Sequence, residues 1–317
     1  MNNGKLNILL AWVRFRFILQ LSWILLFSFI LLLFCFKASY ACRLYAIMFK
    51  NSSATLLEEH LLFGNRSLKT LSNYHNNGWG IAWFSFSGSL QNIERGAIKA
   101  AATSSNFSNR VEFIARQNPK IVVAHIRKGT SGCGGKVKNP HPFHRRMDGK
   151  EWIFAHNGSL NKATIQKIIS DQYLKKNYPN GSGIEKCIKN PVDSEFYFIL
   201  LLKNIKKSVT VIDGIVETVH LLSHESEKGS MNFVLSDGIN IWALRNRINS
   251  YLNPPTLYYI YDDKYSAVAS SKIFLPGQGK KSKWIELKNH ELVILTNNQE
   301  PTIKNIQNRI NMLCNDY

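Results

Sequence analysis

The chain is divided into many short apolar segments that are separated by glycine, asparagine and aspartate. Aromatic and β-branched residues recur in these segments, and most of the segments are shorter than an ordinary helix. Such a pattern is typical of antiparallel sheets whose strands are joined by turns. Segments of this kind lie at residues 44–49, 79–86, 121–126, 152–155, 232–235, 241–244, 256–261, 265–269, 284–287 and 291–295.

Helical periodicity is restricted to fewer segments. Apolar residues follow the spacing i, i+3, i+4 and i+7 over residues 198–205 and again over 212–219, which places them on one face of a helix. Asp193 or Ser194 has a suitable side chain to cap the first of these helices. Two further helix candidates lie at residues 55–71 and 106–117. Strands in two groups with helices against them predict a layered α+β domain.

The composition is that of a folded protein with a basic surface. Of the 317 residues, 45% are hydrophobic, which is enough for a core and excludes a disordered chain. Lys and Arg number 40 against 21 Asp and Glu, for a formal net charge of +19, but the basic residues are spread along the chain. We therefore favour a soluble basic surface over a nucleic-acid groove and expect no nucleic-acid partner.

The five cysteines are too few for a disulfide scaffold in a chain of this length. Cys133 and Cys187 are as well suited to a disulfide in an oxidising compartment as to two free thiols. These two cysteines, His141 and His144 lack a spacing typical of metal ligands. We therefore expect neither a metal site nor a cofactor.

The start of the chain has the pattern of a targeting segment. Three basic residues precede an uncharged apolar run at 17–36, which is long enough either for a secretory signal or for a bilayer span. Ser39 and Ala41 are the small residues that signal peptidase prefers before a cleavage site, here ahead of Cys42. The residues at 39 and 40 disfavour the alternative of a lipid-modified cysteine. This pattern favours removal of residues 1–41 over their retention as an anchor.

We therefore divide the chain into a signal peptide or signal anchor at 1–41, a catalytic domain at 42–300 and a polar tail at 301–317. Cleavage predicts an exported protein of the bacterial periplasm or the extracellular space. Retention predicts a membrane-anchored protein whose domain lies outside, because the positive charges precede the span.

Cleavage after residue 41 would give Cys42 an unusual chemistry. Its thiol and its own α-amine would then lie on the same residue. An α-amine has a pKa of about 7.7–8.0, so part of it is neutral near pH 7 and can accept a proton. The amine can therefore act as the base for its own side chain, with no separate histidine. Without such cleavage, Cys42 has the features of an ordinary small buried residue.

Four later segments combine glycine, histidine and amide or guanidinium side chains. They are Gly-Trp-Gly-Ile-Ala-Trp at 78–83, Ala-His-Ile-Arg-Lys-Gly-Thr-Ser-Gly at 124–132, Asn-Pro-His-Pro-Phe at 139–143 and Phe-Ala-His-Asn-Gly-Ser-Leu at 154–160. With Cys42, the triplet Asp-Ser-Glu at 193–195 and the late Ala-Ser-Ser at 269–271, their order resembles class II glutamine amidotransferase domains. These domains belong to the N-terminal-nucleophile hydrolases, and the stand-alone γ-glutamyl hydrolase-like members are the most similar.

The resemblance implies a four-layer αββα sandwich of two antiparallel sheets. It also implies that Cys42 is the nucleophile and that the Asn157 side chain and the Gly158 backbone N–H form an oxyanion hole. An amide donor and an unhindered backbone N–H can converge on one oxygen where negative charge develops. Read alone, Asn157-Gly158 is an ordinary hairpin turn. A glycan on the Asn157 sequon would block that hole, which favours a bacterial envelope over a eukaryotic secretory route.

The same resemblance also implies which residues bind the amino-acid head group of the substrate. Arg127 matches the residue that binds the α-carboxylate, for which a guanidinium fork is better suited than lysine. Asp193 matches the acceptor for the α-ammonium, a role compatible with a helix cap. Thr130 and His141 match positions that line the glutamine pocket.

Four more residues lie in these motifs, and for most of them a structural role is an alternative. Trp79 and Gly80 match a pocket wall and a close approach, although a buried aromatic beside a tight turn explains Trp79 equally well. His125 and His156 are better explained as structural histidines.

We therefore predict an enzyme, a cysteine amidohydrolase that cleaves the γ-amide of glutamine or of a γ-glutamyl compound through a thioester. One alternative is a membrane-anchored binding protein without catalysis. Another is an N-terminal-cysteine acyl amidase with a different substrate class.

Overall fold

The computed structural model describes residues 42–51, 54–128, 141–177, 191–226, 229–248, 255–276 and 283–315, together with isolated positions at 12, 16, 20 and 23. The chain splits into two units, Met1–Tyr40 and Ala41–Tyr317, and the second carries every element discussed below. In the described ranges, no helix combines the length and the apolar character that a bilayer span requires. The apolar run at 17–36 lies outside these ranges, apart from positions 20 and 23. The targeting segment therefore stays a prediction.

The first strand of the domain, β1, lies in the middle of the first sheet. Its strand order is β12-β10-β11-β1-β4-β2-β3, and every pairing is antiparallel. The strands are β1 (Arg43–Phe49), β2 (Trp79–Phe84), β3 (Leu90–Gly96), β4 (Ile121–Ile126), β10 (Tyr258–Tyr261), β11 (Tyr265–Ala269) and β12 (Ile285–Glu286).

The second sheet is antiparallel as well, in the order β14-β13-β8-β7-β6-β5, with the short β9 paired to β7. The strands are β5 (Phe143–Met147), β6 (Lys150–Ser159), β7 (Gly229–Ser236), β8 (Ile241–Arg245), β9 (Arg247–Ile248), β13 (Glu291–Leu295) and β14 (Thr302–Asn305).

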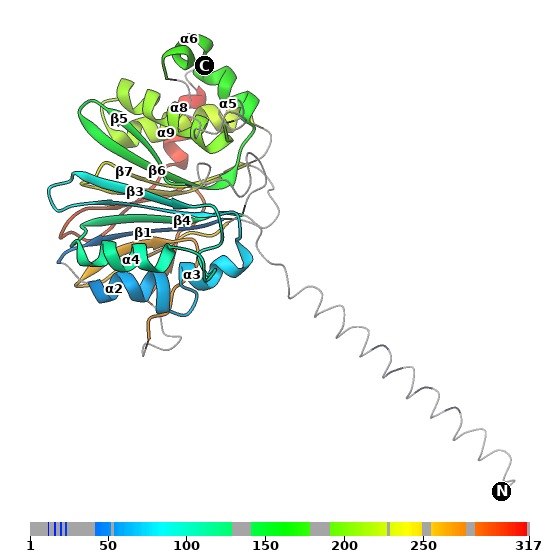
Figure 1. Cartoon of the computed structure of the whole chain (residues 1–317). Coiled ribbons are helices and arrows are strands. Elements are labelled where there is room, and N and C mark those ends of the chain that lie inside the picture. Colours follow the sequence, from blue (N-terminus) through cyan, green and yellow to red (C-terminus); the bar gives the residue numbers. More distant parts are fainter. Residues whose placement is uncertain are drawn as a thin grey trace, which may run out of the picture. The chain divides into compact units, whose positions relative to one another are not determined.

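Helices cover the outer face of each sheet, so the domain has four layers (Figure 1). One helical layer lies on the first sheet and consists of α2 (Ala54–Glu58), the π-helix η1 (Glu59–Phe63), α3 (Leu68–Leu71), the 3-10 helix η2 (Ser72–Tyr74) and α4 (Phe107–Arg116). The other lies on the second sheet and consists of α5 (Lys162–Ile169), α6 (Asp171–Asn177), α8 (Asp193–Lys207), α9 (Val211–Glu225) and α10 (Gln307–Asn315). The predicted αββα sandwich of two antiparallel sheets is confirmed.

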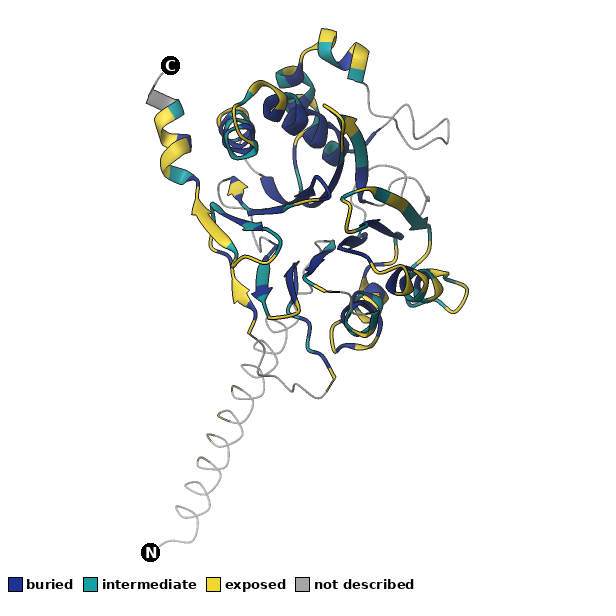
Figure 2. Cartoon of the chain, turned by 90° about the vertical axis from the view of Figure 1, so that its left-hand side faces the viewer, coloured by how far each residue is buried: buried dark blue, intermediate teal, exposed yellow. Residues whose placement is uncertain are grey.

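Side-chain alternation along the strands assigns each residue to a layer. In β1, Leu44, Ala46 and Met48 belong to the core between the two sheets, whereas Tyr45 and Ile47 pack against the helices. Because successive side chains of a strand point to opposite faces, Cys42 is in phase with Leu44 and lies on the inner side. The central strands β1 and β4 are buried on both faces, whereas strands at the sheet edges carry exposed residues (Figure 2). Burial on both faces explains the nearly continuous apolar sequence of the central strands.

The structure corrects two expectations about helices. The single helix predicted over 55–71 is divided at Gly64, where a Cβ would lie 2.6 Å from the carbonyl oxygen of Glu59. Asp193 is the first residue of α8 and does not cap it: Val192 holds the cap position, and the Asp193 carboxylate accepts a hydrogen bond from the Leu160 N–H instead.

The residues predicted as a polar tail, 301–317, are part of the domain as far as they are described. Strand β14 extends the second sheet, and Ile306 and Ile310, just before and within α10, are buried in the core between this sheet and its helices. All four residues of β14 are exposed, so the segment has little of the apolar character that reveals a strand.

Candidate active site

Cys42 lies at the first residue before the central strand β1, and its position is fixed from both sides. On one side, the Lys128 N–H donates to the Cys42 Sγ over 3.3 Å. On the other side, the Leu44 N–H donates to Ser270 Oγ over 2.9 Å, and the Ser270 N–H donates back to the Leu44 carbonyl over 2.9 Å. The sulfur is therefore held at the edge of the space between the sheets.

The surroundings of the sulfur favour a neutral thiol at rest. Burial raises the pKa of Cys42 most strongly. The hydrogen bond from Lys128 and the charges of Arg127 and Arg43 lower that pKa, while the Asp193 carboxylate raises it. A neutral thiol is a weak nucleophile, so the sulfur needs a base to accept its proton.

Asn157 lies on the facing sheet, close to the end of β6. Its neighbours Ile153 and Ala155 belong to the core between the sheets, so strand alternation turns the Asn157 side chain into the same space. The residue is fully buried, and neither Nδ2 nor Oδ1 has a hydrogen-bond partner among the described residues. Leaving a buried polar group unpaired costs about 1–3 kcal/mol, so such an amide is a candidate for contact with a ligand.

Gly158 follows within the strand rather than in a hairpin turn, paired with Met231 of β7. A Cβ at this position would lie 2.1 Å from the Ser230 carbonyl oxygen and 2.6 Å from His156 Nε2. Only glycine fits beside β7 at this point, and its backbone N–H is unhindered by a side chain.

Opposite charges flank the sulfur. Arg127 follows β4 and is 5% exposed, and its backbone is fixed by hydrogen bonds to Gly78 and Asn77. Burial lowers the pKa of its guanidinium, whereas the charges of Cys42 and Asp193 raise it. Asp193 approaches from the start of α8, where its Oδ2 accepts from the Leu160 N–H over 2.8 Å. A guanidinium and a carboxylate close to the same sulfur suit the two charged groups of an amino-acid head.

Three buried histidines lie behind these groups. The ring of His141 is 4.3 Å from that of His125 and 6.5 Å from that of His156. Burial is the main cause of a lowered pKa in all three, which reaches about 3 for His125. These rings are therefore neutral near pH 7, and they form an uncharged wall rather than a source of protons.

His156 also connects three elements. Its Nε2 lies 2.8 Å from the Ser230 carbonyl oxygen and its Nδ1 2.9 Å from Ser194 Oγ. A carbonyl only accepts, so Nε2 carries the proton and Nδ1 accepts from the serine hydroxyl. This arrangement ties β6, β7 and the start of α8 together and supports the structural interpretation of His156.

Two of the remaining predicted residues, Gly80 and Trp79, lie on opposite faces of strand β2. A Cβ on Gly80 would lie 2.1 Å from the His141 carbonyl oxygen, so the chain passes close to Gly80 on the inner side. Trp79 points to the outer face, where its Nε1 donates to Ser105 Oγ over 3.0 Å and its ring contacts Phe107. Its position fits the structural alternative and not a wall of this site. Thr130 lies outside the described residues.

Sequence reasoning assigned no role to two positions that the geometry brings to the sulfur. Lys128 contributes a backbone N–H, which no side-chain pattern can reveal. Ser270 belongs to the late Ala-Ser-Ser motif, and its hydroxyl holds the start of β1. The described residues contain no group of three or more His, Cys, Asp or Glu side chains arranged to hold a metal ion.

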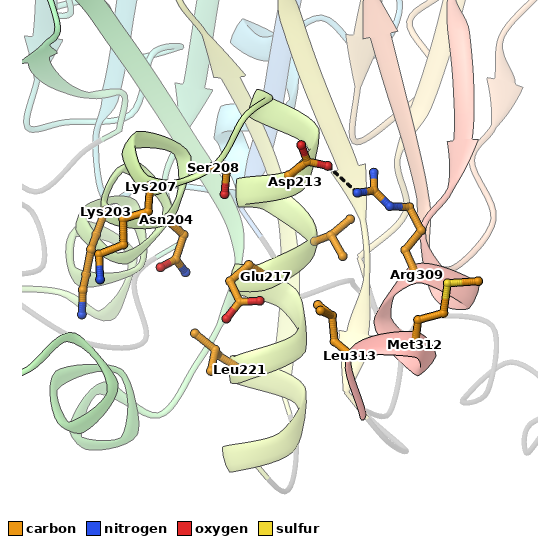
Figure 3. A pocket seen from close by; sticks show the side chains of 11 residues that line it. Lys203, Asn204, Lys207, Ser208, Asp213, Glu217, Leu221, Arg309, Met312 and Leu313 are labelled. Carbon is orange, nitrogen blue, oxygen red and sulfur yellow. Dashed lines mark hydrogen bonds and ion pairs between the residues drawn. The ribbon is translucent and has the colours of Figure 1, made fainter. Parts of the chain in front are cut away.

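A cavity of about 590 Å³ lies elsewhere, between α8, α9 and α10 (Figure 3). Its rim carries an ion pair between Arg309 and Asp213. Because these helices cover the outer face of the second sheet, this cavity is separated from Cys42 by that sheet.

Comparison with known proteins agrees with this geometry. Residues 41–268 match the family model of class-II glutamine amidotransferases. The chain is 32% identical over 184 residues to an uncharacterized protein of Methanocaldococcus jannaschii, covering 57% of this chain and 45% of that protein. It is 29% identical over 181 residues to a candidate glutamine amidotransferase of Haemophilus influenzae, covering 55% and 54% respectively. The chain thus spans about half the length of these relatives.

Solved structures share the fold. A class-II domain protein of Silicibacter pomeroyi superposes with a TM-score of 0.51 at 18% identity, over 83% of this chain and 99% of that one. The glutamine phosphoribosylpyrophosphate amidotransferase of Bacillus subtilis superposes with a TM-score of 0.52 at 17% identity, over 84% of this chain and 49% of that enzyme. The family match over most of the domain and the shared sandwich lead to one conclusion: this chain belongs to the class-II glutamine amidotransferases.

Proposed function

We propose that the protein is a cysteine amidohydrolase that cleaves the γ-amide of glutamine or of a γ-glutamyl compound through a thioester on Cys42. The observation that supports this most directly is the buried amide of Asn157, which faces the same space as the Cys42 sulfur and has no hydrogen-bond partner in the described part of the chain. A buried amide kept without a partner beside a thiol is what an oxyanion hole requires before the substrate arrives.

The reaction follows from these groups. Arg127 binds the α-carboxylate of the glutamyl portion, and Asp193 accepts from its α-ammonium. The Cys42 sulfur attacks the γ-carbonyl carbon, and the α-amine of the same residue takes the thiol proton. Negative charge that develops on the carbonyl oxygen is stabilised by Asn157 Nδ2 and the Gly158 N–H.

Collapse of this intermediate breaks the carbon–nitrogen bond. The α-ammonium of Cys42 returns its proton to the departing nitrogen, which leaves as ammonia or as an amine. Water then attacks the thioester, again with the α-amine as base, and releases glutamate and the free thiol. Each step uses the same proton acceptor, so the neutral histidines are not needed as bases.

This mechanism requires cleavage after Ala41, because an internal Cys42 has an amide nitrogen that cannot accept a proton. We therefore also propose that residues 1–41 are removed during export to the periplasm or the extracellular space. The support is the sequence pattern of the leader. Hydrolysis needs no further chain, whereas transfer of ammonia would need a synthase partner.

The test combines processing with turnover. The full-length chain is expressed in a bacterial host, and the purified material is examined by intact mass and N-terminal sequencing. Its activity is measured on glutamine, on γ-glutamyl amines and on acyl amides without an amino-acid head group. We expect a chain that starts at Cys42 and turns over only the first two classes.

A Cys42→Ala variant should lose all turnover, while Cys42→Ser retains the fold and little activity. Full activity in a chain that still carries residue 41 would refute the mechanism. Preference for acyl amides would instead indicate the acyl amidase, and a retained leader without turnover would indicate the anchored binding protein.

A further inference from the structure

A second polar cavity begins one strand away from Asn157. It measures about 310 Å³ and is lined by Asn232, Arg245, Asn246, Arg247 and Lys288, among others. Asn232 of β7 is the cross-strand partner of Asn157. Phe233 of β7 is paired with Leu244 of β8, and continuing this register by one residue puts Arg245 opposite Asn232. Asn157, Asn232 and Arg245 thus form one row across three strands of the second sheet.

This row faces the space between the sheets. Ala243 belongs to the core between the sheets, so Arg245 has the same orientation by strand alternation. Its Nη1 reaches across to the first sheet, where it donates to Glu286 Oε1 over 2.6 Å and to the Leu287 carbonyl. Asn232 also crosses, because its Nδ2 donates to the Pro255 carbonyl over 2.7 Å. Neighbouring strands lie about 4.8 Å apart, so Arg245 is roughly 10 Å from Asn157.

The strand order shows on which side of Cys42 this cavity lies. Arg127 follows β4, which adjoins β1 on one side. On the other side of β1 come β11 and then β10, which begins just after Pro255 of the cavity wall. A substrate whose glutamyl head is held at Arg127 therefore has its scissile bond at Cys42 and its departing group directed toward the cavity.

The cavity is lined by positively charged side chains and by a buried polar atom that is available to a ligand. The side chains of Arg247 and Lys288 make no ion pair with a described residue. The nearest carboxylates are otherwise engaged: Glu286 pairs with Arg245, and Glu291 accepts from the Lys288 N–H. Asn246 is 1% exposed, and its Oδ1 has no partner among the described residues.

We propose that this cavity receives an anionic group on the amine portion of the substrate, so that the enzyme prefers γ-glutamyl amines with a distal carboxylate or phosphate over glutamine itself. This inference rests on the proposed function. Arg247 and Lys288 pair with the anion, and Asn246 Oδ1 can accept a hydrogen bond from an N–H or O–H donor of the group that carries the anion. A separation of roughly 10 Å from the oxyanion amide suits an amine of amino-acid size or larger, and ammonia would leave the cavity unused.

Binding to a Cys42→Ala protein tests the proposal without relying on turnover. The probes are γ-glutamyl-5-aminopentanoate and its terminal primary amide, which differ only in the distal charge. Calorimetry should show the carboxylate binding about tenfold more tightly, as expected for charge-assisted hydrogen bonds. Adding Arg247→Gln and Lys288→Met should bring the two dissociation constants together. The control is Lys304→Met, which removes an exposed cation on β14 and should keep the preference.

Equal binding of the two probes, or a preference that survives the double substitution, would overturn the cavity assignment. The proposed function fails separately, if the unsubstituted protein hydrolyses neither probe. In that case the calorimetric preference still decides whether the cavity is an anion site.

Discussion

Asn157 and Asn232 are neighbouring asparagines on the same sheet face, and they should respond in opposite ways to the same substitution. Asn157 has two unpaired polar atoms among the described residues, so replacing it with leucine of similar volume removes an existing cost. Asn232 donates to the Pro255 carbonyl over 2.7 Å and accepts from the Asn246 N–H over 2.9 Å. Replacing it with leucine leaves two buried groups unpaired.

The magnitudes follow from these contacts. We expect Asn157→Leu to leave the free energy of unfolding unchanged or to raise it by about 1 kcal/mol, since an unpaired buried amide costs about 1–3 kcal/mol. The same variant should lower kcat/KM for γ-glutamyl hydrolysis by about 100- to 1,000-fold, the usual effect of losing one oxyanion donor. Asn232→Leu should lower the free energy of unfolding by about 2–4 kcal/mol, as two partners are stranded.

Urea denaturation followed by tryptophan fluorescence and a glutamate-release assay measure the two quantities on the same preparations. A loss of stability in Asn157→Leu as large as that in Asn232→Leu would show that Asn157 has a structural partner. Asn157 would then be a structural residue rather than an oxyanion donor.

Three further predictions concern other buried groups. Burial lowers the pKa of His60 to about 3, below its unfolded value of about 6.5, so its native state binds fewer protons than its unfolded state. The free energy of unfolding should therefore fall as the pH drops from about 6.5 toward 3. In urea titrations, His60→Phe should reduce this fall by about 1.4 kcal/mol per pH unit. The same pH dependence in the variant and the unsubstituted protein would show that His60 is not buried in its neutral form. Gly80→Ala should lower the melting temperature through a clash of about 1–3 kcal/mol with the His141 carbonyl, and a native melting curve would show that the chain can move aside. Arg127→Lys keeps the charge but loses the fork, so KM for γ-glutamyl substrates should rise more than kcat falls in steady-state assays; an unaltered KM would argue against carboxylate binding.

The apolar pattern predicted a layered α+β domain because the central strands are buried on both faces, and the four-layer sandwich was implied by the family resemblance. Apolar runs such as 44–49 and 121–126 match β1 and β4 almost residue for residue. The strands it missed are β3, β5 and β14, which all lie at sheet edges, and the two-residue β9, which pairs with β7 outside the main strand order. Edge strands are paired on one side only and carry polar residues, so they lack the apolar signal.

The site was predictable to the extent that its chemistry resides in side chains. Cys42, Arg127 and Asp193 lie close enough to influence one another electrostatically, and the roles that the family resemblance implies for them stay predictions. The orientation of Trp79 was harder to predict. The motif shows that Trp79 and Gly80 are neighbours in sequence, but it does not show which face of the strand each side chain occupies. The Lys128 N–H and the row from Asn157 to Arg245 depend on strand register, which becomes known only when the sheets are assembled.

The place of β1 in the first sheet has a consequence for biosynthesis. The Leu44 N–H bonds a hydroxyl 226 positions further along the chain, and β1 pairs with both β4 and β11. During translation the earliest strand of the domain thus emerges long before one of its two neighbours has been made. Contacts of such high sequence separation slow folding. The nascent polypeptide therefore exposes the apolar strand β1 until almost its whole length has left the ribosome. A chaperone that shields this strand should increase the yield of native protein.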